Sequence, residues 1–509
     1  MQARDTSLFP AAVLDALADA ADRPVFEHGD RLVTGREVLD LTARAAAGLR
    51  AEGIGPGDGV ALALGIHHQA FATILAVYAV GARLMGLRPG LPDTHVQYLL
   101  GLDNAVVITD HSTGYRAGHV RALDMDALLA TEPEPLRPAA RPDDVARLIH
   151  TSGSTGVPKP VAQTYTAMTA EWAWSPHRWA PAIRDLAPRM DRFLLFETLA
   201  SQVVFQYTAM TVVVGGIVVV ADLVDPSGPE TLPEALARSR ATATAVTVPR
   251  LSSMITQQRT RPSDLSALQA ILVSGSPLSH DRHHEAQVVL GPVVFHGYGQ
   301  TEAGMIAMGT PADPPGTVGF PSDKVELEIR DPRGGLVPHG GEGELFVRTP
   351  NQSCGYWADP ELTAEVYVDG WIRTRDLGRL DDDGRLRITG RARDVVIVDA
   401  AVHYIGPIER AIAEHPDIVE AYVVAVPDET TGEAVHAFVV AADGRDPDPD
   451  EVRALVIDRV GPACAPRRVT TIAAPPIGPS GKPDKLRLFQ QALAEADLPR
   501  TPSETTAGG

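Results

Sequence analysis

Two kinds of segment alternate along the chain from the N-terminus to about residue 390: short apolar runs and longer stretches with helical spacing. Short runs rich in β-branched and small apolar residues occur at 60–64, 105–110, 217–222, 243–248 and 270–275. Runs of this kind are typical of strands that are buried on both faces. The stretches between them, such as 36–53 and 68–82, carry Ala and Leu at helical spacing. Strand–helix alternation predicts an α/β fold with a mostly parallel sheet and helices on its faces.

One apolar segment resembles a membrane span in length. Residues 198–221 carry no charged side chain. However, Gln202 and Gln206 interrupt the apolar surface, and Gly215 and Gly216 break the segment in two. The pattern therefore predicts a buried helix followed by a buried parallel strand, and no membrane span.

The pattern of hydrophobic and polar residues changes at two points further along the chain. From about residue 317 short strands and turns predict a small β-rich subdomain, and the Asp381–Gly384 turn between alternating runs predicts a hairpin. After Arg393 a second strand–helix alternation predicts a small α+β domain. We expect a large N-terminal domain at 1–392, a small C-terminal domain at 393–497 and a disordered tail at 498–509.

Composition excludes several classes of protein. Hydrophobic residues make up 44% and charged residues 22% of the 509 residues, which is ordinary for a globular chain. The formal net charge of −20 makes the chain a poor general binder of nucleic acid. Two cysteines form no disulfide framework, and we expect free, buried or half-buried thiols. The histidines show no metal-ligand spacing, and His280, His283 and His284 are expected to be solvated. No signal-peptide pattern begins the chain, so a cytoplasmic location is expected.

Lysine is rare in this chain, which directs attention to the loops that contain it. Of the 45 basic residues, four are lysines: Lys159, Lys324, Lys482 and Lys485. Lys159 ends the sequence Thr-Ser-Gly-Ser-Thr-Gly-Val-Pro-Lys, which begins at Thr151 after a predicted strand. Its glycines free the backbone to curl around an anion, and its hydroxyls and ammonium can bind phosphate oxygens. The spacing differs from that of a Walker loop.

Four further motifs come after this loop in order. They are Ser274–Leu278, His296–Glu302, the pair Thr374–Gly378 and Gly390–Asp394, and Pro479–Lys482. In content and order the five motifs resemble those of the acyl-adenylate-forming superfamily, which includes acyl-CoA synthetases, adenylation domains and luciferases. The resemblance spans about residues 10–490, and it implies a large nucleotide-binding domain with a small, mobile C-terminal lid.

The resemblance implies a role for each motif. ATP and AMP binding fall to Thr151, Ser152, Gly153, Ser154, Thr155, Gly156, Lys159, Ser274, Gly275, Ser276, His296, Gly297, Tyr298, Gly299, Asp376 and Arg391. Thr301, Glu302 and Lys482 are the catalytic candidates. The hydroxyl of Thr301 can bind the α-phosphate, and Glu302 offers an oxygen ligand for Mg²⁺. The ammonium of Lys482 can stabilise the charge that develops when a carboxylate attacks that phosphate. We expect Lys485 to be solvated.

The chain departs from the family pattern at several positions. The hinge position is Arg393, and Ala400 stands where the family has the second glycine of a loop that lines the pantetheine tunnel. Arg375 and Pro160 each replace a customary glycine. For the acyl pocket, Ala200 stands where many relatives carry an aromatic residue or His. Gln202 stands where amino-acid-activating relatives carry an Asp that pairs with the α-ammonium. Small and neutral residues there favour an uncharged acyl or aryl group.

The function implied is ATP-dependent activation of a small carboxylic acid to an acyl-AMP with release of pyrophosphate. Transfer to the thiol of coenzyme A is the leading hypothesis for the second step. The alternatives are the phosphopantetheine of a carrier protein acting in trans, or a non-thiol nucleophile. A luciferase-like oxidoreductase and a non-catalytic binding module are disfavoured, the latter because Lys159, Glu302, Asp376 and Lys482 are all present.

Overall fold

The structure is a computed structural model. It describes residues 8–110, 112, 114–115, 118–152, 158–221, 230–276, 278–392, 394–398, 401–428, 430–442, 444–478 and 482–496, with the backbone alone at 151, 152, 401, 402 and 496. The chain forms two compact units. The first unit contains the described residues up to Thr374 and Arg379–Arg387, and the second contains Arg375–Gly378 and the described residues from Ile388 onward. The boundary therefore runs through two strands of a hairpin.

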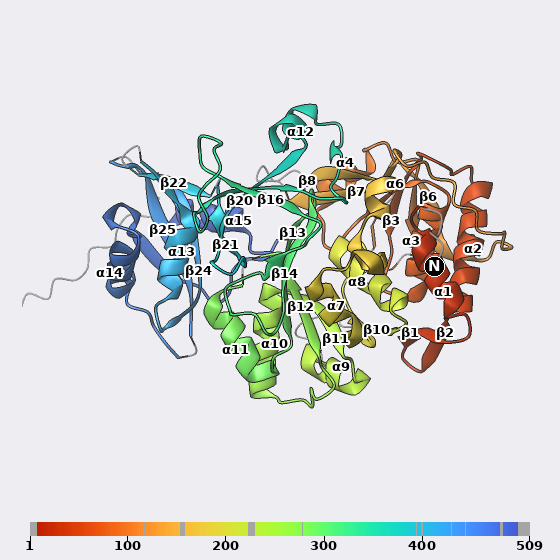
Figure 1. The fold of residues 1–509 in the computed structure, drawn as a ribbon, viewed down its shortest axis with the longest axis horizontal. Coiled ribbons are helices and arrows are strands. Elements are labelled where there is room, and N and C mark those ends of the chain that lie inside the picture. Colours follow the sequence, from red (N-terminus) through yellow and green to blue (C-terminus); the bar gives the residue numbers. More distant parts are fainter. Residues whose placement is uncertain are drawn as a thin grey trace, which may run out of the picture. The chain divides into compact units, whose positions relative to one another are not determined.

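The largest sheet of the first unit has nine strands in the order β15-β14-β13-β12-β11-β9-β10-β1-β2 (Figure 1). Its strands are β1 (Pro24–His28), β2 (Arg31–Thr34), β9 (Arg192–Leu195), β10 (Ile217–Val220), β11 (Ala243–Thr247), β12 (Ala270–Ser274), β13 (Val294–Gln300), β14 (Gly304–Gly309) and β15 (Phe320–Pro321). Strands β13 to β1 along this order are parallel, and β14, β15 and β2 are antiparallel to their neighbours.

The second sheet has seven strands in the order β18-β8-β7-β4-β3-β5-β6. They are β3 (Gly59–Ala63), β4 (Arg83–Gly86), β5 (Val106–Thr109), β6 (Arg121–Asp124), β7 (Val145–Ser152), β8 (Pro158–Thr164) and β18 (Gly355–Tyr356). A third sheet contains β16 (Glu326–Arg330), β17 (Gly343–Arg348), β19 (Tyr367–Val368), β20 (Trp371–Leu380) and β21 (Leu386–Arg391). The last two strands are the hairpin predicted around the Asp381–Gly384 turn.

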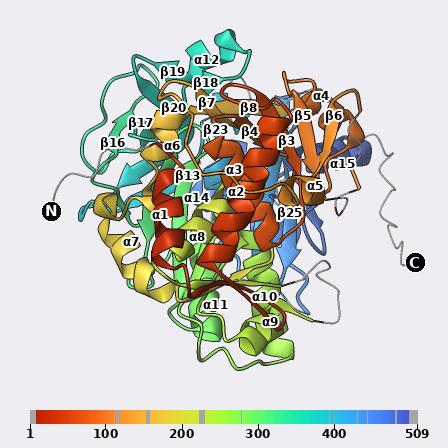
Figure 2. The ribbon, with the colours of Figure 1, turned by 90° about the vertical axis from the view of Figure 1, so that its right-hand side faces the viewer.

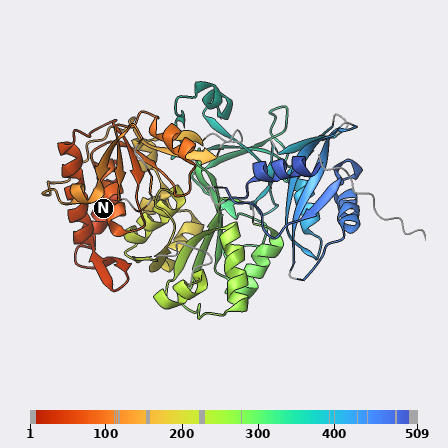
Figure 3. The same cartoon turned by 180° about the vertical axis from the view of Figure 1, so that it is seen from behind.

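Helices of the first unit cover these sheets. They are α1 (Ala11–Asp19), α2 (Gly35–Ala51), α3 (His68–Ala79), α4 (Asp93–Leu100), α5 (Met125–Leu129), α6 (Tyr165–Thr169), α7 (Pro181–Leu186), α8 (Gln202–Val213), α9 (Leu232–Ser239), α10 (Val248–Thr260), α11 (His280–Leu290) and α12 (Pro360–Val366), with short 3₁₀ turns at Trp172–Trp174, Pro176–Arg178 and Ala187–Arg189. Helices α2 and α3 pack side by side (Figure 2). Helices α10 and α11 pack against each other beside β12 and β13 of the nine-stranded sheet (Figure 3).

The second unit is a small α+β structure. Its sheet has the order β23-β22-β25-β24, with β26 beside β25. The elements are β22 (Val395–Val398), β23 (Ala401–Tyr404), α13 (Ile405–Ala413), β24 (Ile418–Asp428), β25 (Gly432–Ala441), α14 (Pro449–Arg459), a 3₁₀ turn at Pro462–Cys464, β26 (Arg468–Thr471) and α15 (Lys485–Ala496). Helix α13 packs on β24 and contributes Ile405, Ile408 and Ile412 to the core.

The local sequence explains the main elements. Helix α2 begins at a capping box in which Thr34 Oγ1 accepts from the Glu37 backbone and the Glu37 carboxylate accepts from the Thr34 backbone. The apolar segment that resembles a membrane span is the buried helix α8 followed by β10, which lies between two parallel neighbours. Both the predicted fold class and this interpretation are confirmed. Among the described residues no helix is long and apolar enough to cross a bilayer.

Two smaller expectations need correction. His283, expected to be solvated, lies on the inner face of α11 with 2% of its surface exposed, because α11 turns that face toward β13. Both cysteines are free, as expected; Cys464 is buried, whereas Cys354 is exposed.

The first prediction concerns Gly216, which comes after α8. A Cβ at this position would overlap the backbone carbonyl of Met190 and lie 2.9 Å from that of Asp191. Backbone atoms cannot move aside cheaply, so Gly216→Ala should lower the free energy of unfolding by roughly 1–3 kcal/mol. Chemical denaturation measures this change. Gly55→Ala is the matched control, because a Cβ there meets open space; equal stabilities of the two variants would contradict the prediction.

The second prediction concerns His68, which is 3% exposed and whose ring nitrogens have no hydrogen-bond partner among the described residues. Burial lowers its pKa to about 4, against about 6.5 in the unfolded chain. The neutral ring therefore contributes stability above pH 6.5 that is lost progressively as the pH falls toward 4, by up to about 3 kcal/mol. His68→Leu should make this acid slope shallower in pH-dependent unfolding. An unchanged slope would contradict the prediction, and His280→Gln at an exposed site is the control.

Candidate active site

The predicted phosphate loop joins the ends of β7 and β8. These strands are antiparallel, and the pairing brings Thr151 opposite Lys159 and Ser152 opposite Pro158. Lys159 is half-buried at the start of β8. Gly153, Ser154, Thr155 and Gly156 lie outside the described residues, so the structure positions the two ends of the loop and one cationic side chain.

The predicted adenine side lies where β12 and β13 end. These neighbouring parallel strands pair Val273 with His296, which brings Ser274–Ser276 beside the His296–Gly299 segment. Gly275 has a φ of +96°, a conformation that favours glycine. Tyr298 is half-buried. His296 is 6% exposed, and burial lowers its pKa to about 4, so it is a neutral ring within the sheet.

Thr301, Glu302 and Ala303 form the tight turn between β13 and β14. The antiparallel register pairs Gln300 with Gly304 across it. The Glu302 carbonyl oxygen accepts from the backbone N–H of Ser353 at 2.8 Å and from its Oγ at 2.9 Å. Thr349 Oγ1 donates to the Ala303 carbonyl at 2.7 Å. The turn is therefore fixed by hydrogen bonds from the 349–353 segment, which sequence reasoning had not connected with it.

The side chain of Glu302 is held as well. Tyr356 donates its hydroxyl to Glu302 Oε1 at 2.5 Å. Tyr356 belongs to β18, which pairs with β8 so that Tyr356 lies opposite Val161, two residues from Lys159. Strand β18 thus links the strand that carries Lys159 to the side chain of Glu302.

Glu302 fits a magnesium site built mainly by phosphates. Its Oε1 takes the Tyr356 hydroxyl, and its other oxygen is a hard ligand of the kind Mg²⁺ uses alongside phosphate and water. No cluster of three or more His, Cys, Asp or Glu side chains that could enclose a metal occurs in the part of the chain that the structure describes. A metal here would depend on the nucleotide for most of its ligands.

The predicted acyl-pocket residues lie at the start of α8. Ala200 borders a hollow whose other lining residues are Leu62, Leu64, Gly65, Ala70, Ile74, Leu84, Gly86, Leu87 and Leu199. Every side chain in this lining is apolar. Gly86 allows the close approach, because a Cβ on it would lie 2.7 Å from that of Ala200. Gln202 is half-buried and points its amide nitrogen toward Glu171 Oε1 at 3.5 Å.

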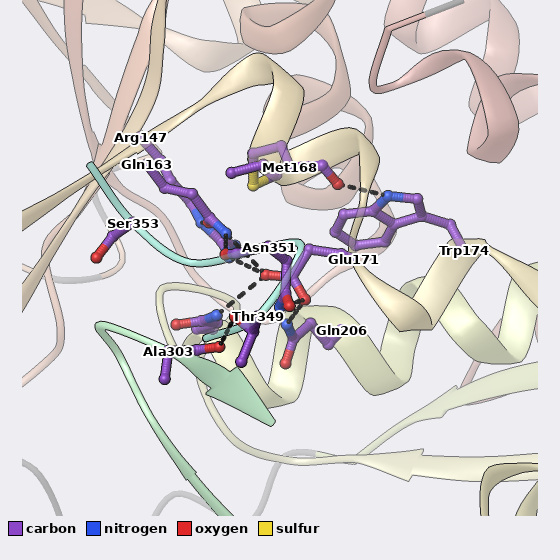
Figure 4. A network of polar contacts seen from close by, with 12 residues as sticks. Arg147, Gln163, Met168, Glu171, Trp174, Gln206, Ala303, Thr349, Asn351 and Ser353 are labelled. Carbon is purple, nitrogen blue, oxygen red and sulfur yellow. Dashed lines mark hydrogen bonds and ion pairs between the residues drawn. The ribbon is translucent and has the colours of Figure 1, made fainter. Parts of the chain in front are cut away.

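A buried ionic network lies beneath these elements (Figure 4). Glu171 is completely buried and forms an ion pair with Arg147 at 3.0 Å. Side-chain amides of Gln163, Gln206 and Asn351 also donate to its carboxylate, at 3.0, 2.9 and 2.9 Å. Burial raises the pKa of Glu171, and Arg147 and the three amides oppose that rise. Sequence reasoning missed this network, because its members come from five separate segments.

The predicted ribose-binding pair belongs to the second unit. Asp376 on β20 is 3% exposed and forms an ion pair with Arg391 Nε on β21 at 2.8 Å. A solvated turn residue would not be buried in this way. The neighbouring Arg375 has a φ of +60°, which explains why relatives place glycine there. The hinge residue Arg393 and the loop residue Ala400 lie outside the described residues.

The C-terminal lysines have different environments. Lys482 is exposed, and its carbonyl accepts from the Gly478 N–H at 2.8 Å where the chain doubles back. Lys485 is not simply solvated as expected, because it forms ion pairs with Asp394 at 2.9 Å and Glu409 at 3.0 Å. These bonds tie the start of α15 to β22 and α13 within the second unit.

Comparison with known proteins agrees with this arrangement. Residues 14–357 match the AMP-binding enzyme family, and residues 407–482 match the AMP-binding enzyme C-terminal domain. A feruloyl-CoA synthase from Amycolatopsis is 31% identical over 89% of this chain and 93% of its own. A fatty acid–[acyl-carrier-protein] ligase from Streptomyces coeruleorubidus is 36% identical over about half of each chain, 48% and 49%.

Among solved structures, the amide bond synthetase McbA from Marinactinospora thermotolerans superposes with a TM-score of 0.83. It is 35% identical over 95% of this chain and 100% of its own. The family match covers both units, and relatives of 30% identity or more extend along almost the full length. The chain therefore belongs to the AMP-binding enzyme family and is an AMP-forming ligase.

Proposed function

We propose that the protein activates a small, uncharged aryl or alkyl carboxylic acid with ATP and transfers the acyl group to a thiol, that of coenzyme A. In the first step a carboxylate oxygen attacks the α-phosphorus and the bond to pyrophosphate breaks, which gives acyl-AMP. In the second step a thiolate attacks the acyl carbonyl, and AMP leaves. These are cytoplasmic substrates, so the cytoplasm is the proposed compartment.

The observation that carries this proposal is the link made by β18. Through Tyr356 the strand that carries Lys159 is joined to the carboxylate of Glu302. A cation and a metal-binding carboxylate held in fixed relation suit the triphosphate of ATP. When bound, Mg²⁺ would neutralise phosphate charge, and Glu302 is the residue proposed to hold it.

The remaining residues receive proposed roles from their placement. Tyr298 offers a ring face to the purine, and Thr301 a hydroxyl to the α-phosphate. The buried carboxylate of Asp376 is suited to accept hydrogen bonds from the ribose hydroxyls, because its ion pair with Arg391 already orients it, and Arg391 can donate to them. Exposed Lys482 is proposed to stabilise the charge that develops between the two anions.

An amine acceptor is the second candidate. The amide bond synthetase shares 35% identity with almost the whole chain, more than the 31% of the feruloyl-CoA synthase. Ala400 stands where the family places a glycine near the pantetheine. A carrier-protein thiol is supported by the fatty acid–[acyl-carrier-protein] ligase that matches 48% of the chain.

Acid-dependent release of pyrophosphate tests the first step. The panel should contain ferulate, benzoate and fatty acids of increasing length. We expect release with at least one apolar acid and a loss of about 100-fold or more in Lys482→Ala, as for removal of a group that stabilises the transition state. Lys324→Ala is the matched control, since Lys324 is an exposed lysine paired with Asp323. Activity of Lys482→Ala within a few-fold of wild type would refute its role.

The acceptor is identified by mass spectrometry of the products. Parallel reactions receive coenzyme A, a phosphopantetheinylated carrier protein or a primary amine. The leading proposal expects the acyl-CoA thioester as the main product. Formation of the amide alone, with no thioester, would replace the thiol by the second candidate.

A further prediction concerns Tyr356. Tyr356→Phe removes the hydrogen bond to Glu302 but keeps the ring, so we expect kcat for pyrophosphate release to fall about tenfold with little change in KM for ATP, in line with loss of a hydrogen bond to a charged group. Steady-state kinetics give both values. Tyr422→Phe is the control, because Tyr422 donates a comparable bond to Glu420 on β24. Equal kcat in wild type and Tyr356→Phe would show that the bond is not needed.

A further inference from the structure

The buried carboxylate of Glu171 has more donors than an ordinary ion pair. Its Oε1 accepts from Arg147 and from Gln163, each at 3.0 Å, and its Oε2 accepts from Gln206 and Asn351, each at 2.9 Å. The side chain of Arg147 is 4% exposed. An ionised carboxylate has no proton to donate, so each amide must turn its nitrogen toward it. Glu171 thereby fixes the orientation of all these side chains.

The network joins the elements that carry the proposed site. Arg147 and Gln163 lie on β7 and β8, which flank the phosphate loop, and Gln206 lies on α8 one turn after Gln202 (Figure 4). Gln163 also accepts from Arg147 Nε at 2.6 Å and donates to the Asn351 carbonyl at 2.8 Å. The carboxylate of Glu171 thus contacts three parts of the proposed site: the strands that flank the phosphate loop, helix α8 and the 349–353 segment.

Asn351 connects this charge to the 301–304 turn. Its side chain lies directly against Gly304, whose φ is +72°, so that a Cβ on Gly304 would overlap the Asn351 amide. On either side of it, Thr349 and Ser353 hold the carbonyls of Ala303 and Glu302. Tyr367 forms a further hydrogen bond with the hydroxyl of Ser353. The position of Asn351 therefore determines where the turn can lie.

We infer that Glu171 is a positioning residue for the adenylation step, acting through Asn351 on the turn that carries Thr301 and Glu302. This inference rests on the proposed function for the roles of those two residues. Glu171 touches no substrate in this scheme. It holds the phosphate-loop strands and the Glu302 turn in fixed relative positions. It also connects both to α8, at whose start the acid is proposed to bind.

A purely structural role is the competing explanation, because removing one partner of a buried ion pair destabilises a protein wherever the pair lies. The two explanations predict different kinetics at temperatures where every variant is folded. A positioning role lowers kcat for pyrophosphate release with little effect on KM for ATP, since the turn acts on the transition state. A structural role lowers the unfolding temperature alone.

The experiment compares Glu171→Gln and Asn351→Ala with wild type at least 15 °C below the lowest unfolding temperature. Glu27→Gln is the matched control, since Glu27 forms an ion pair in the same unit with Arg192 at 2.9 Å. Arg192 is the first residue of β9 and takes no part in the Glu171 network. We expect kcat to fall tenfold or more in both test variants and less than twofold in the control. Values of kcat within twofold of wild type in both test variants would overturn the inference.

A double variant tests whether restoring the hydrogen bond between residues 171 and 351 restores kcat. In Glu171→Gln with Asn351→Asp, amide and carboxylate exchange places, so the 171–351 hydrogen bond returns while Gln206 loses its acceptor. We expect kcat to recover at least fivefold over Glu171→Gln although the unfolding temperature stays low. Recovery of stability without recovery of kcat would favour the structural explanation.

Hydrogen–deuterium exchange keeps the inference separate from the proposed function. A peptide covering residues 298–306 should exchange faster in Asn351→Ala and Glu171→Gln than in wild type, and Glu27→Gln should not alter it. If wild type activates no acid in the panel, the proposed function fails, and this exchange measurement alone decides whether Glu171 positions the turn. Unchanged exchange in both test variants would overturn the inference.

Discussion

Much of the first unit depends on a charge that water cannot reach. An isolated buried carboxylate is very costly, so Glu171 is compatible with the fold only while Arg147 and its amide donors stay in place. Those donors lie on strands of the second sheet, on α8 and in the segment after β17. The requirement to satisfy one group therefore fixes the mutual arrangement of elements that apolar packing alone would leave free to slide.

The second unit also contains a charged side chain that joins separate segments through ion pairs. Lys485 satisfies two carboxylates, one on the residue before β22 and one on α13. Because Lys485 lies three residues after Lys482, this anchor sets where the exposed lysine leaves the body of the unit. Each unit thus contains a buried or half-buried ion pair that fastens a segment next to proposed site residues.

The sequence was informative wherever structure depends on neighbours in the chain. The runs at 60–64, 217–222 and 270–275 are parallel strands, and the apolar segment is α8 followed by β10, because hydrophobic period and glycine breaks are local signals. Motif order pointed to Glu302 and Asp376, whose roles remain predictions. Nothing local marks Glu171, Asn351 or Tyr356: Glu171 and Asn351 are 180 residues apart, and only tertiary folding makes them partners. For the same reason Lys485 was wrongly expected to be solvated.

The contact between Gly86 and Ala200 has a consequence for engineering. A Cβ at position 86 would lie 2.7 Å from the Cβ of Ala200 and 2.8 Å from its Cα, so position 86 has no room for a side chain even when position 200 is small. A library that randomises both at once would consist mostly of overpacked proteins. The shape of this hollow is therefore best altered by varying position 200 while glycine is kept at position 86.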